Sequence, residues 1–349
     1  MIRDSVFVGL SGGVDSAVST ALLKEQGYDV VGAFIKIWQP EFIECNWKEE
    51  RLDALRVCAA LDIPFHEIDF SQEYKKEVVD TMVSDYEHGI TPNPDVLCNR
   101  AIKFGSFAAW AKGQGAHSIA TGHYARKKDA SGHFELLRAA DAAKDQSYFL
   151  YRLRQQDLAR AMFPIGHLQK KEVRALAKRF KLPVAEKPDS QGLCFIGKVS
   201  MRDFLSRFIK VENGPVVDTS GKVVGEHEGA AFYTLGQRHG FISSGGPYYI
   251  TDINVQKNTV HVSTQREDAQ VLRASLTDTS WIHREPVLAH TYDAQARYHE
   301  KPIRATLSRS DDDLEVSFQE SHIAPPGQSL VLYEGEVCLG GGTLVKKVR

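Results

Sequence analysis

The chain has 349 residues, of which 42 % are hydrophobic and 25 % are charged, and these values are typical of a soluble globular protein with two or three domains. No window approaches the roughly 18 uninterrupted apolar residues of a membrane-spanning helix, and no secretory signal precedes the first strand-like run, so we expect a cytoplasmic protein without a membrane partner. The formal net charge of −2 excludes a protein that is basic throughout, although RNA binding needs only a local basic face.

The first half of the sequence alternates strand-like and helical patterns. Short, nearly continuous apolar runs predict strands over residues 6–10, 30–35, 65–68 and 118–121. Helical periodicity between them predicts helices over residues 17–26, 48–61, 71–88 and 101–112. This alternation predicts a parallel sheet covered by helices on both faces, with a ligand site beyond the carboxyl ends of the strands.

The second half of the sequence has a different pattern of residues. After a short helix expected near residues 201–209, turn sequences separate short β-branched and aromatic runs, which is typical of all-β modules. Near the end, a hairpin is predicted from residues 330–333 and 336–339. We therefore expect an α/β domain of residues 1–197, a small central β domain of residues 198–273, and a C-terminal β-barrel of residues 274–349.

A glycine-rich turn, residues 9–16, joins the first predicted strand to the first helix; we call it the phosphate loop. Gly12 and Gly13 let the backbone approach a ligand closely, and the helix N-terminus offers N–H groups to a phosphate. Ser11 and Ser16 can add hydroxyl donors, and Asp15 is placed to hold Mg²⁺ on phosphate oxygens. A lone Gly-Gly pair is more often an ordinary turn, but the serines, the acid and the position favour a nucleotide site.

The loop is neither a Walker A motif, which requires a lysine, nor a G-x-G-x-x-G turn. Its order Ser-Gly-Gly-x-Asp-Ser resembles the PP-loop, or N-type ATP pyrophosphatase, superfamily. That resemblance implies cleavage of ATP between the α and β phosphates and adenylation of a carbonyl oxygen. It indicates a chemistry but not a substrate.

Two cysteines lie in loops that suit reactive thiols. Cys98 lies in residues 91–100, a proline-restricted loop predicted to enter a helix at Ala101, where the helix dipole lowers a thiol pKa. Cys194 lies in residues 188–195, which contain Pro and Gly. Each alone could equally be a small buried thiol, but two such loops beside a phosphate loop favour catalysis.

The other three cysteines carry no such pattern. Cys58 falls in an apolar helical repeat and Cys338 in the predicted hairpin, so both are expected in hydrophobic cores, and Cys45 stays unassigned. The odd total of five, with no C-x-x-C pair, disfavours a disulfide scaffold and a cysteine-rich zinc site.

Several separated motifs together resemble the bacterial tRNA-specific 2-thiouridylases of the MnmA type, over essentially the whole chain. They are residues 9–16, 93–104, 121–125, 144–149, 189–195, 234–238, 297–298 and 326–328. One departure is Ile37, where relatives usually carry Asn, and nothing indicates that it affects catalysis. The resemblance implies a PP-loop domain of Rossmann-like α/β fold followed by two small all-β domains.

The resemblance also implies which residues form the sites. The nucleotide would be bound by Gly9, Leu10, Ser11, Gly12, Gly13, Val14, Asp15, Ser16, Ile35 and Gly122. The target base would contact Asn93, Pro94 and Asp95, and further tRNA contacts would come from His123, Lys144, Asp145, Gln146, Arg297, Tyr298 and Gln328. From the sequence alone, Arg297 and Tyr298 would be read as ordinary barrel surface.

The implied reaction uses ATP with Mg²⁺ to adenylate the C2 carbonyl oxygen of the wobble uridine in a tRNA anticodon loop. Cys194 would carry a persulfide from a sulfur carrier or a cysteine desulfurase. Either its terminal sulfur attacks C2 directly, or Cys98 attacks Cys194 and releases hydrosulfide. Asp95 would be the acid/base.

Two other functions remain open from the residues themselves. One is a PP-loop amidotransferase or ligase acting on a small metabolite, and the other is an RNA-binding protein with a vestigial nucleotide site. Lys170, Arg174 and Lys178 form a helical stripe that is usually a solvated face, although in a nearly neutral protein it slightly favours phosphate contact.

Overall fold

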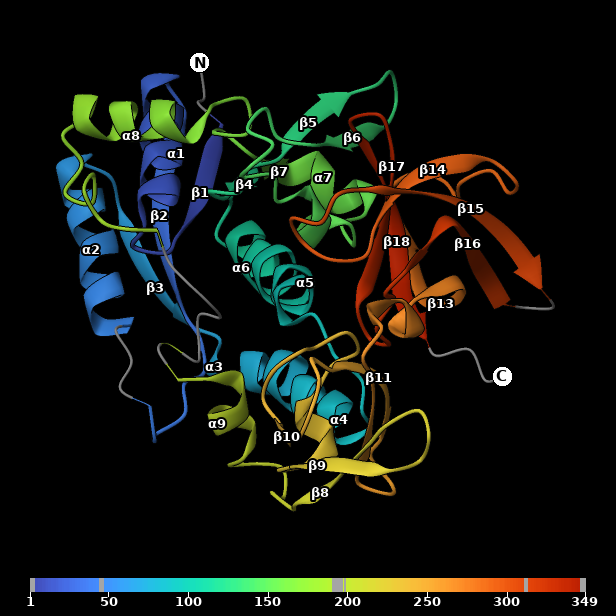
Figure 1. Cartoon of the computed structure of the whole chain (residues 1–349). Helices are drawn as coiled ribbons and strands as arrows, with labels where there is room; N and C mark the ends of the chain where they lie inside the picture. The colour runs from blue at the N-terminus through green and yellow to red at the C-terminus, as the bar shows by residue number, and fades with distance from the viewer. Residues whose placement is uncertain (1–3, 44–46, 190–196, 198, 311–312, 346–349) are drawn as a thin grey trace.

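The structure is a computed structural model that describes residues 4–43, 47–189, 197, 199–310 and 313–345. Within these residues three sheets follow one another along the chain, the first parallel and the others built mainly of antiparallel pairs (Figure 1). The predicted succession of an α/β domain and two β modules is confirmed. No described helix is both long and apolar enough to cross a membrane.

The first sheet has the strand order β3-β2-β1-β4-β7, and every neighbouring pair is parallel. Its strands are β1 (Ser5–Leu10), β2 (Asp29–Lys36), β3 (Phe65–Asp69), β4 (Ser118–Ala120) and β7 (Ala161–Met162). The first four agree with the predicted strands. The two residues of β7 are too few to produce a recognisable sequence pattern, so this strand was not predicted.

Helices cover both faces of this sheet, as predicted (Figure 1). One face carries α1 (Val14–Glu25), α2 (Trp47–Ala60) and α8 (Lys170–Arg179). The other carries α3 (Ser71–Tyr74), η1 (Lys75–Asp80), α4 (Thr81–Glu87), α5 (Pro94–Cys98), η2 (Asn99–Ser106) and α6 (Phe107–Gly113). Both η1 and η2 are π-helical, so two continuous helices each contain a widened turn.

The predicted start of a helix at Ala101 is wrong. The helix begins at Pro94, seven positions earlier, because Asn93 caps it: its Oδ1 accepts from the Val96 N–H at 3.4 Å. Proline is favourable at the first helical position, where its missing N–H is not needed. Cys98 therefore lies inside the helix rather than before it. At this position the helix dipole lowers a thiol pKa less than it would at the helix N-terminus.

A hairpin from the first half of the chain belongs to the last sheet. β5 (Arg126–Asp129) and β6 (Phe134–Leu137) pair with each other, and β6 pairs with β18 of the C-terminal barrel. They are followed by η3 (Ser147–Leu150) and α7 (Gln155–Arg160). The sequence analysis did not anticipate this crossing of the expected boundary near residue 197.

The central β module follows α9 (Met201–Leu205), which is shorter than the predicted helix. Its sheet order is β10-β9-β8-β12-β11. The strands are β8 (Gly214–Val217), β9 (Val223–His227), β10 (Ile242–Ser243), β11 (Tyr249–Asn254) and β12 (Thr259–Ser263), with short 3-10 turns η4 (Ala230–Phe232) and η5 (Arg266–Ala269).

Six antiparallel strands close the C-terminal barrel, because β13 pairs with both β16 and β18. They are β13 (Val271–Trp281), β14 (Thr291–Gln295), β15 (Ile303–Ser310), β16 (Asp313–His322), β17 (Ser329–Glu334) and β18 (Val337–Val345). The predicted tail hairpin is β17 and β18, although both strands are longer than expected. The barrel encloses its own core of buried side chains, including Leu307, Val316 and Leu330.

Candidate functional site

The phosphate loop is an open turn between β1 and α1. Gly12 has a φ of +72°, and a Cβ atom there would lie 2.4 Å from the carbonyl oxygen of Glu50. Gly13 is the N-cap of α1 and makes no side-chain cap, so the helix presents its first N–H groups to a ligand. The Ser16 hydroxyl accepts from the Ser11 N–H at 3.3 Å and donates to the Gly13 carbonyl at 3.2 Å. These contacts keep the turn narrow enough to surround a phosphate.

The loop sits where the strand order changes direction. β1 lies between β2 and β4, so the carboxyl ends of these three strands meet at one edge, the usual ligand site of such sheets. Gly122 follows β4, and a Cβ atom there would lie 2.6 Å from the Ser16 nitrogen. Ile35, near the end of β2, approaches the Cβ position of Gly9 to 4.0 Å. The structure thus brings together the predicted nucleotide residues from three strands.

Asp15 is held by two side chains from distant parts of the chain. Its carboxylate pairs with Lys170 Nζ at 2.7 and 2.9 Å and accepts from the Tyr124 hydroxyl at 2.8 Å. Burial and the charge of Asp15 raise the pKa of Tyr124 well above its usual value, so this hydroxyl remains a donor. Reading the Lys170 stripe as a solvated face is wrong for its first member, because Lys170 points to the phosphate loop.

The same lysine links the phosphate loop to Asp189. Lys170 Nζ lies 2.9 Å from the Asp189 carboxylate, which also receives Lys144 at 2.9 Å and Arg174 at 2.6 Å. Burial works to raise the pKa of Asp189, but the hydrogen bonds from Lys170 and Lys144 outweigh it and hold the pKa well below the ordinary value. Asp189 is therefore a fixed anion beside the nucleotide site.

Cys194 lies in residues 190–196, outside the described residues. The described chain stops at Asp189, beside the phosphate loop, and its next described residue is Gly197, whose Cβ position is 3.9 Å from the Ile43 side chain. The expected meeting of Cys98 and Cys194 therefore stays a prediction.

The predicted base-contacting residues occupy the start of α5. Asn93 is the N-cap, Pro94 is the first helical residue, and Asp95 and Cys98, three positions apart, share one helix face. Burial raises the pKa of Asp95, and the charge of Lys103 works in the opposite direction. A carboxyl whose pKa is raised toward neutrality is suited to proton transfer.

Tyr298 and Arg297, from the barrel domain, contact the other two parts of the molecule. The Tyr298 ring packs on Phe149 with centroids 4.4 Å apart, and burial, then the charges of Asp145 and Asp95, raise the pKa of Tyr298 to about 12. Arg297 donates to the Leu235 carbonyl at 3.2 Å. The reading of these two residues as ordinary barrel surface is wrong, because they face the other two parts of the molecule.

His123 is buried and held between two polar side chains. Its Nδ1 lies 2.7 Å from the Thr121 hydroxyl, and its Nε2 lies 3.4 Å from Lys103 Nζ. Burial, together with the charge of Lys103, lowers the pKa of His123 far below its usual value, so the ring is neutral. Sequence analysis assigned His123 to tRNA contact and did not identify Lys103.

The three residues of the Lys-Asp-Gln motif have different surroundings. Asp145 is buried, accepts from the backbone N–H groups of Ala139 and Ser147, and pairs with Arg138 at 3.1 Å. Gln146 accepts from the Tyr124 N–H at 2.9 Å. Only Lys144, paired with Asp189, keeps a substantially exposed side chain among the three. Asp145 and Gln146 therefore stabilise the surrounding backbone by accepting its N–H groups, and Lys144 is the cation that the motif presents at the surface.

All three parts of the chain meet around the segment that leads into α5. Gln328, from the barrel, donates through Nε2 to the carbonyl oxygens of Thr91 and Pro92 at 2.9 and 3.1 Å. The hydroxyls of Thr91 and Thr234, the latter from the central module, lie 3.0 Å apart. Tyr148 donates to the barrel carbonyl of Ser329 at 2.9 Å. The barrel and the central module thus hold Thr91 and Pro92, which lead into α5, in place.

The two cysteines expected in hydrophobic cores are there. Cys58 and Cys338 are each 1 % exposed, and burial raises the pKa of each thiol to about 12. A thiol with so high a pKa carries almost no thiolate at neutral pH, so neither suits sulfur transfer. Cys45 lies outside the described residues.

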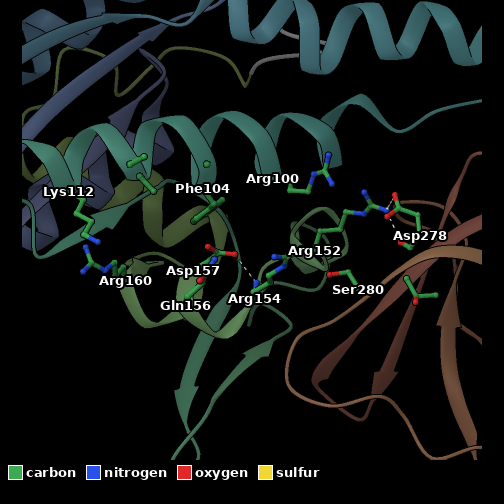
Figure 2. Close-up of a pocket in the computed structure, with 14 residues that line it drawn as sticks. Arg100, Phe104, Lys112, Arg152, Arg154, Gln156, Asp157, Arg160, Asp278 and Ser280 are labelled. Atoms are coloured by element: carbon green, nitrogen blue, oxygen red, sulfur yellow. Dashed lines mark hydrogen bonds and ion pairs between the residues drawn. The ribbon is translucent and has the colours of Figure 1, made fainter.

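A polar hollow of about 540 Å³ lies between η2 and α6, α7 and β13 (Figure 2). Arg100, Lys112, Arg154 and Arg160 line it and are exposed, and their side chains form no ion pair with a carboxylate among the described residues. A fifth cation, Arg152, is buried and paired with Asp278. Sequence analysis missed this hollow, because its cations come from segments whose proximity only the fold creates.

Family profiles match nearly the whole chain. Residues 4–198 match the tRNA methyl transferase HUP domain, residues 202–264 the tRNA methyl transferase PRC-barrel domain, and residues 272–344 the aminomethyltransferase β-barrel domain. The three matched segments follow the three sheets of the structure, apart from the β5–β6 hairpin.

Two solved structures give partial matches at low TM-score. NMN synthetase from Francisella tularensis has a TM-score of 0.37 at 18 % identity, covering 58 % of this chain and 72 % of that one. The U34-tRNA thiolase NcsA from Methanococcus maripaludis has a TM-score of 0.36 at 20 % identity, covering 58 % and 63 %.

Curated relatives are similar over their full length. The tRNA-specific 2-thiouridylase MnmA of Nitrosomonas eutropha is 44 % identical over 365 residues, covering 100 % of both chains. The proteins of that name from Cupriavidus pinatubonensis and Proteus mirabilis are 44 % and 43 % identical, covering 97 % and 99 % of this chain and 98 % of each relative. The phosphate loop, the Asp95–Cys98 helix face and this full-length similarity lead to one conclusion: the chain belongs to the MnmA family of tRNA-specific 2-thiouridylases.

Proposed function

We propose that this protein catalyses the ATP-dependent 2-thiolation of the wobble uridine in tRNA, in the cytoplasm. The observation that carries the proposal is the position of Lys170, which pairs with Asp15 of the phosphate loop and with Asp189, the last described residue before Cys194. Asp189 lies beside the phosphate loop, and Cys194, the cysteine proposed to carry the sulfur, follows it five positions later in the sequence. The full-length similarity to named 2-thiouridylases supports the same activity.

ATP fits the phosphate loop on the evidence of its backbone. A Cβ atom at Gly12 or Gly122 would clash with the Glu50 carbonyl or the Ser16 nitrogen, so both glycines let the loop backbone pack closely, and the N-terminus of α1, which has no side-chain cap, directly follows Gly13. In the proposal residues 9–16, Ile35 and Gly122 bind ATP. Asp15 would hold Mg²⁺, which neutralises phosphate charge, once its ion pair with Lys170 opens.

The base pocket is proposed at Asn93, Pro94 and Asp95. A wobble base in a single-stranded loop can be turned out at low cost, and a preformed pocket offsets that cost. The anchoring of this segment by Gln328 and Thr234 supports a preformed pocket. Further RNA contacts are proposed for His123, Lys144, Asp145, Gln146, Arg297, Tyr298 and Gln328.

In the first step the C2 carbonyl oxygen of the uridine attacks the α-phosphorus of ATP. A P–O bond forms, pyrophosphate leaves, and the base becomes adenylated at that oxygen. AMP is then the leaving group at C2. Asp95, whose pKa burial raises, is the proposed proton donor and acceptor.

In the second step sulfur replaces that oxygen. Cys194 carries a persulfide delivered by a sulfur carrier or a cysteine desulfurase. In one route its terminal sulfur bonds to C2 while AMP leaves, and Cys98 then attacks the Cys194 sulfur, which breaks the S–S bond and frees the 2-thiouridine. In the other, Cys98 attacks the Cys194 sulfur first, and the released hydrosulfide bonds to C2 while AMP leaves. Both routes end in a Cys98–Cys194 disulfide that an external thiol must reduce.

The hollow beside α6 is proposed as part of the RNA-binding surface. Its four unpaired cations lie in a protein whose formal net charge is −2, so they are a local exception to the overall balance. Phosphodiester groups are the ligand class that such a cluster attracts. We also propose domain limits of 1–197, 198–273 and 274–349, with the β5–β6 hairpin and the first residues of β13, from Val271, joined to the barrel.

The direct test incubates the protein with a pool of tRNA transcripts, ATP and a cysteine desulfurase, followed by nucleoside mass analysis and measurement of AMP and pyrophosphate. We expect 2-thiouridine together with both products. Amination of a small acid with AMP release would favour a PP-loop ligase, and RNA binding without AMP would favour a vestigial nucleotide site.

Cys98→Ser and Cys194→Ser should each abolish thiolation while tRNA binding survives, because each removes one sulfur of the relay. Cys338→Ala is the matched control, since this buried thiol has no role in the proposal. Thiolation that persists in either serine variant would remove that cysteine from the mechanism.

A further inference from the structure

Lys103 is a cation in the candidate site to which neither the sequence analysis nor the proposed mechanism gives a role. It lies on η2, half-buried, with its Nζ 3.4 Å from the Nε2 of His123. Its charge acts directly on Asp95, since Lys103 is the named influence that opposes the burial of that carboxyl. One ammonium therefore connects the base-contacting helix to the end of β4.

The π-helical spacing of η2 puts Lys103 on the helix face that carries Cys98. A π-helix closes i→i+5 rings, so residues five apart stack on one face. Two neighbouring contacts show this spacing in η2: the Ser106 hydroxyl donates to the Ala101 carbonyl at 3.3 Å, and the Cβ position of Gly105 lies 2.9 Å from the Arg100 carbonyl. Since η2 begins directly after Cys98, the face that carries Asp95 and Cys98 continues to Lys103.

The hydrogen bonds of His123 orient this cation. A lysine ammonium only donates, so the neutral His123 must accept through Nε2 and carry its proton on Nδ1, which donates to Thr121 Oγ1. Thr121 directly precedes Gly122 at the phosphate loop. The imidazole thus ties Lys103 to the nucleotide edge of the sheet without adding a charge of its own.

Lys103 differs from the other cations of the site in having no anion to neutralise it. Lys170, Lys144 and Arg174 are all paired with carboxylates, whereas Lys103 has none within 4.0 Å among the described residues. Among the described residues, Tyr298 is the ionisable group from another part of the chain that interacts with Asp95, and it is neutral because its pKa is raised to about 12. Lys103 is therefore the charged group that acts on Asp95 in the described part of the site.

We propose that Lys103 is a positioning residue of the thiolation reaction, which supplies the positive charge against which Asp95 moves protons and Cys98 reacts as a thiolate, with His123 holding it in place. The inference rests on the proposed function for its role in thiolation. Its electrostatic part concerns Cys98 and Asp95 alone.

The first test measures the rate at which Cys98 is alkylated in the absence of RNA and ATP. In a Cys45→Ser/Cys194→Ser protein, the remaining thiols Cys58 and Cys338 are buried, so iodoacetamide reports on Cys98. Lys103→Met should slow alkylation at pH 7 about tenfold, corresponding to about one unit in the thiol pKa, and Lys103→Arg should restore most of the rate. Lys76→Met, an exposed lysine on η1, is the matched control and should leave the rate unchanged.

An unchanged alkylation rate in Lys103→Met, with the thermal unfolding temperature of the parent protein, would overturn the electrostatic role. This result is independent of tRNA thiolation, so it separates failure of the inference from failure of the proposed function. If Lys103→Met unfolds, the alkylation rates of Lys103→Gln and Lys103→Arg are compared instead, and equal rates in these two folded variants would overturn the electrostatic role.

The second test uses the pH profile of kcat/KM for thiolation. Because the Lys103 charge lowers the Asp95 pKa against the effect of burial, its removal raises that pKa further, and the limb of the profile due to Asp95 should move about one unit to higher pH. Lys103→Arg should return the limb to its original position. A purely structural residue would lower kcat without moving the limb, and that result would contradict the proposal.

Discussion

Backbone geometry requires glycine at two positions, Gly12 in the phosphate loop and Gly122 beside it. Gly12 adopts a positive φ, a region that L-residues rarely occupy, and its missing Cβ avoids the Glu50 carbonyl. Gly122 has no such torsion, but its missing Cβ leaves room for the Ser16 nitrogen of another strand connection. Sequence analysis could assign the first from its motif, while the reason for the second appears only when β1 and β4 are paired.

Gly122→Ala should weaken ATP binding at least tenfold, because the added methyl group would sit 2.6 Å from the Ser16 nitrogen and displace the phosphate loop. Isothermal titration with ATP measures the effect. Gly113→Ala, at the end of α6 with no atom within 4 Å of its Cβ position, is the control and should bind ATP normally. Equal affinities in the two variants would show that the loop tolerates the methyl group.

At the same scale, the partners of Asp15 illustrate what a motif leaves out. The motif predicted an acid next to phosphate, which agrees with its place in the loop. It did not predict that Lys170, 155 positions later, would occupy that acid. An ion pair between distant residues leaves no local pattern, since either partner could have been a surface charge.

Among the elements, the helix that carries Asp95 and Cys98 shows how local signals compete. The prolines of residues 91–100 indicated a rigid loop, yet Pro94 with the Asn93 cap starts a helix. The same residues support both interpretations, because proline restricts a loop and also suits the first turn of a helix. The widened turn of η2 could not be read from the sequence, as no residue type specifies a π-helix.

The contact between Gln328, which directly precedes β17, and the segment before α5 yields a second prediction. Gln328→Ala removes two hydrogen bonds to the Thr91 and Pro92 carbonyls and should lower the free energy of unfolding by about 1–2 kcal/mol, with a reduced rate of thiolation. Gln328→Glu should be more harmful, because a carboxylate oxygen would face two carbonyl oxygens. Urea denaturation and single-turnover thiolation check both effects, and a Glu variant as stable as the parent protein would contradict this account.

For the whole molecule, the basic hollow predicts a salt-dependent contribution to RNA affinity. Replacing Arg100, Lys112 and Arg160 together by Gln should weaken tRNA binding and reduce the slope of log affinity against log salt by about two to three, roughly one for each lost phosphate contact. ATP affinity should not change. Binding isotherms at several salt concentrations measure the slope.

Three exposed lysines on other surfaces, Lys76, Lys222 and Lys257, provide the charge-matched control when replaced by Gln. Their loss changes the net charge equally but should leave the slope nearly intact. If both triple variants weaken binding alike, net charge rather than the hollow determines the affinity.

The sequence by itself determined the alternation of strands and helices, the phosphate loop, the core positions of Cys58 and Cys338, and the family. These follow from local periodicity, turn chemistry and short motifs, which are present within a few consecutive residues. Only the tertiary structure decided that Lys170 joins Asp15 to Asp189, that Gln328 holds the segment before α5, that the β5–β6 hairpin extends the barrel, and that Lys103 lies between His123 and Asp95. Each of these contacts joins residues distant along the chain, and it depends on packing geometry that no local pattern encodes.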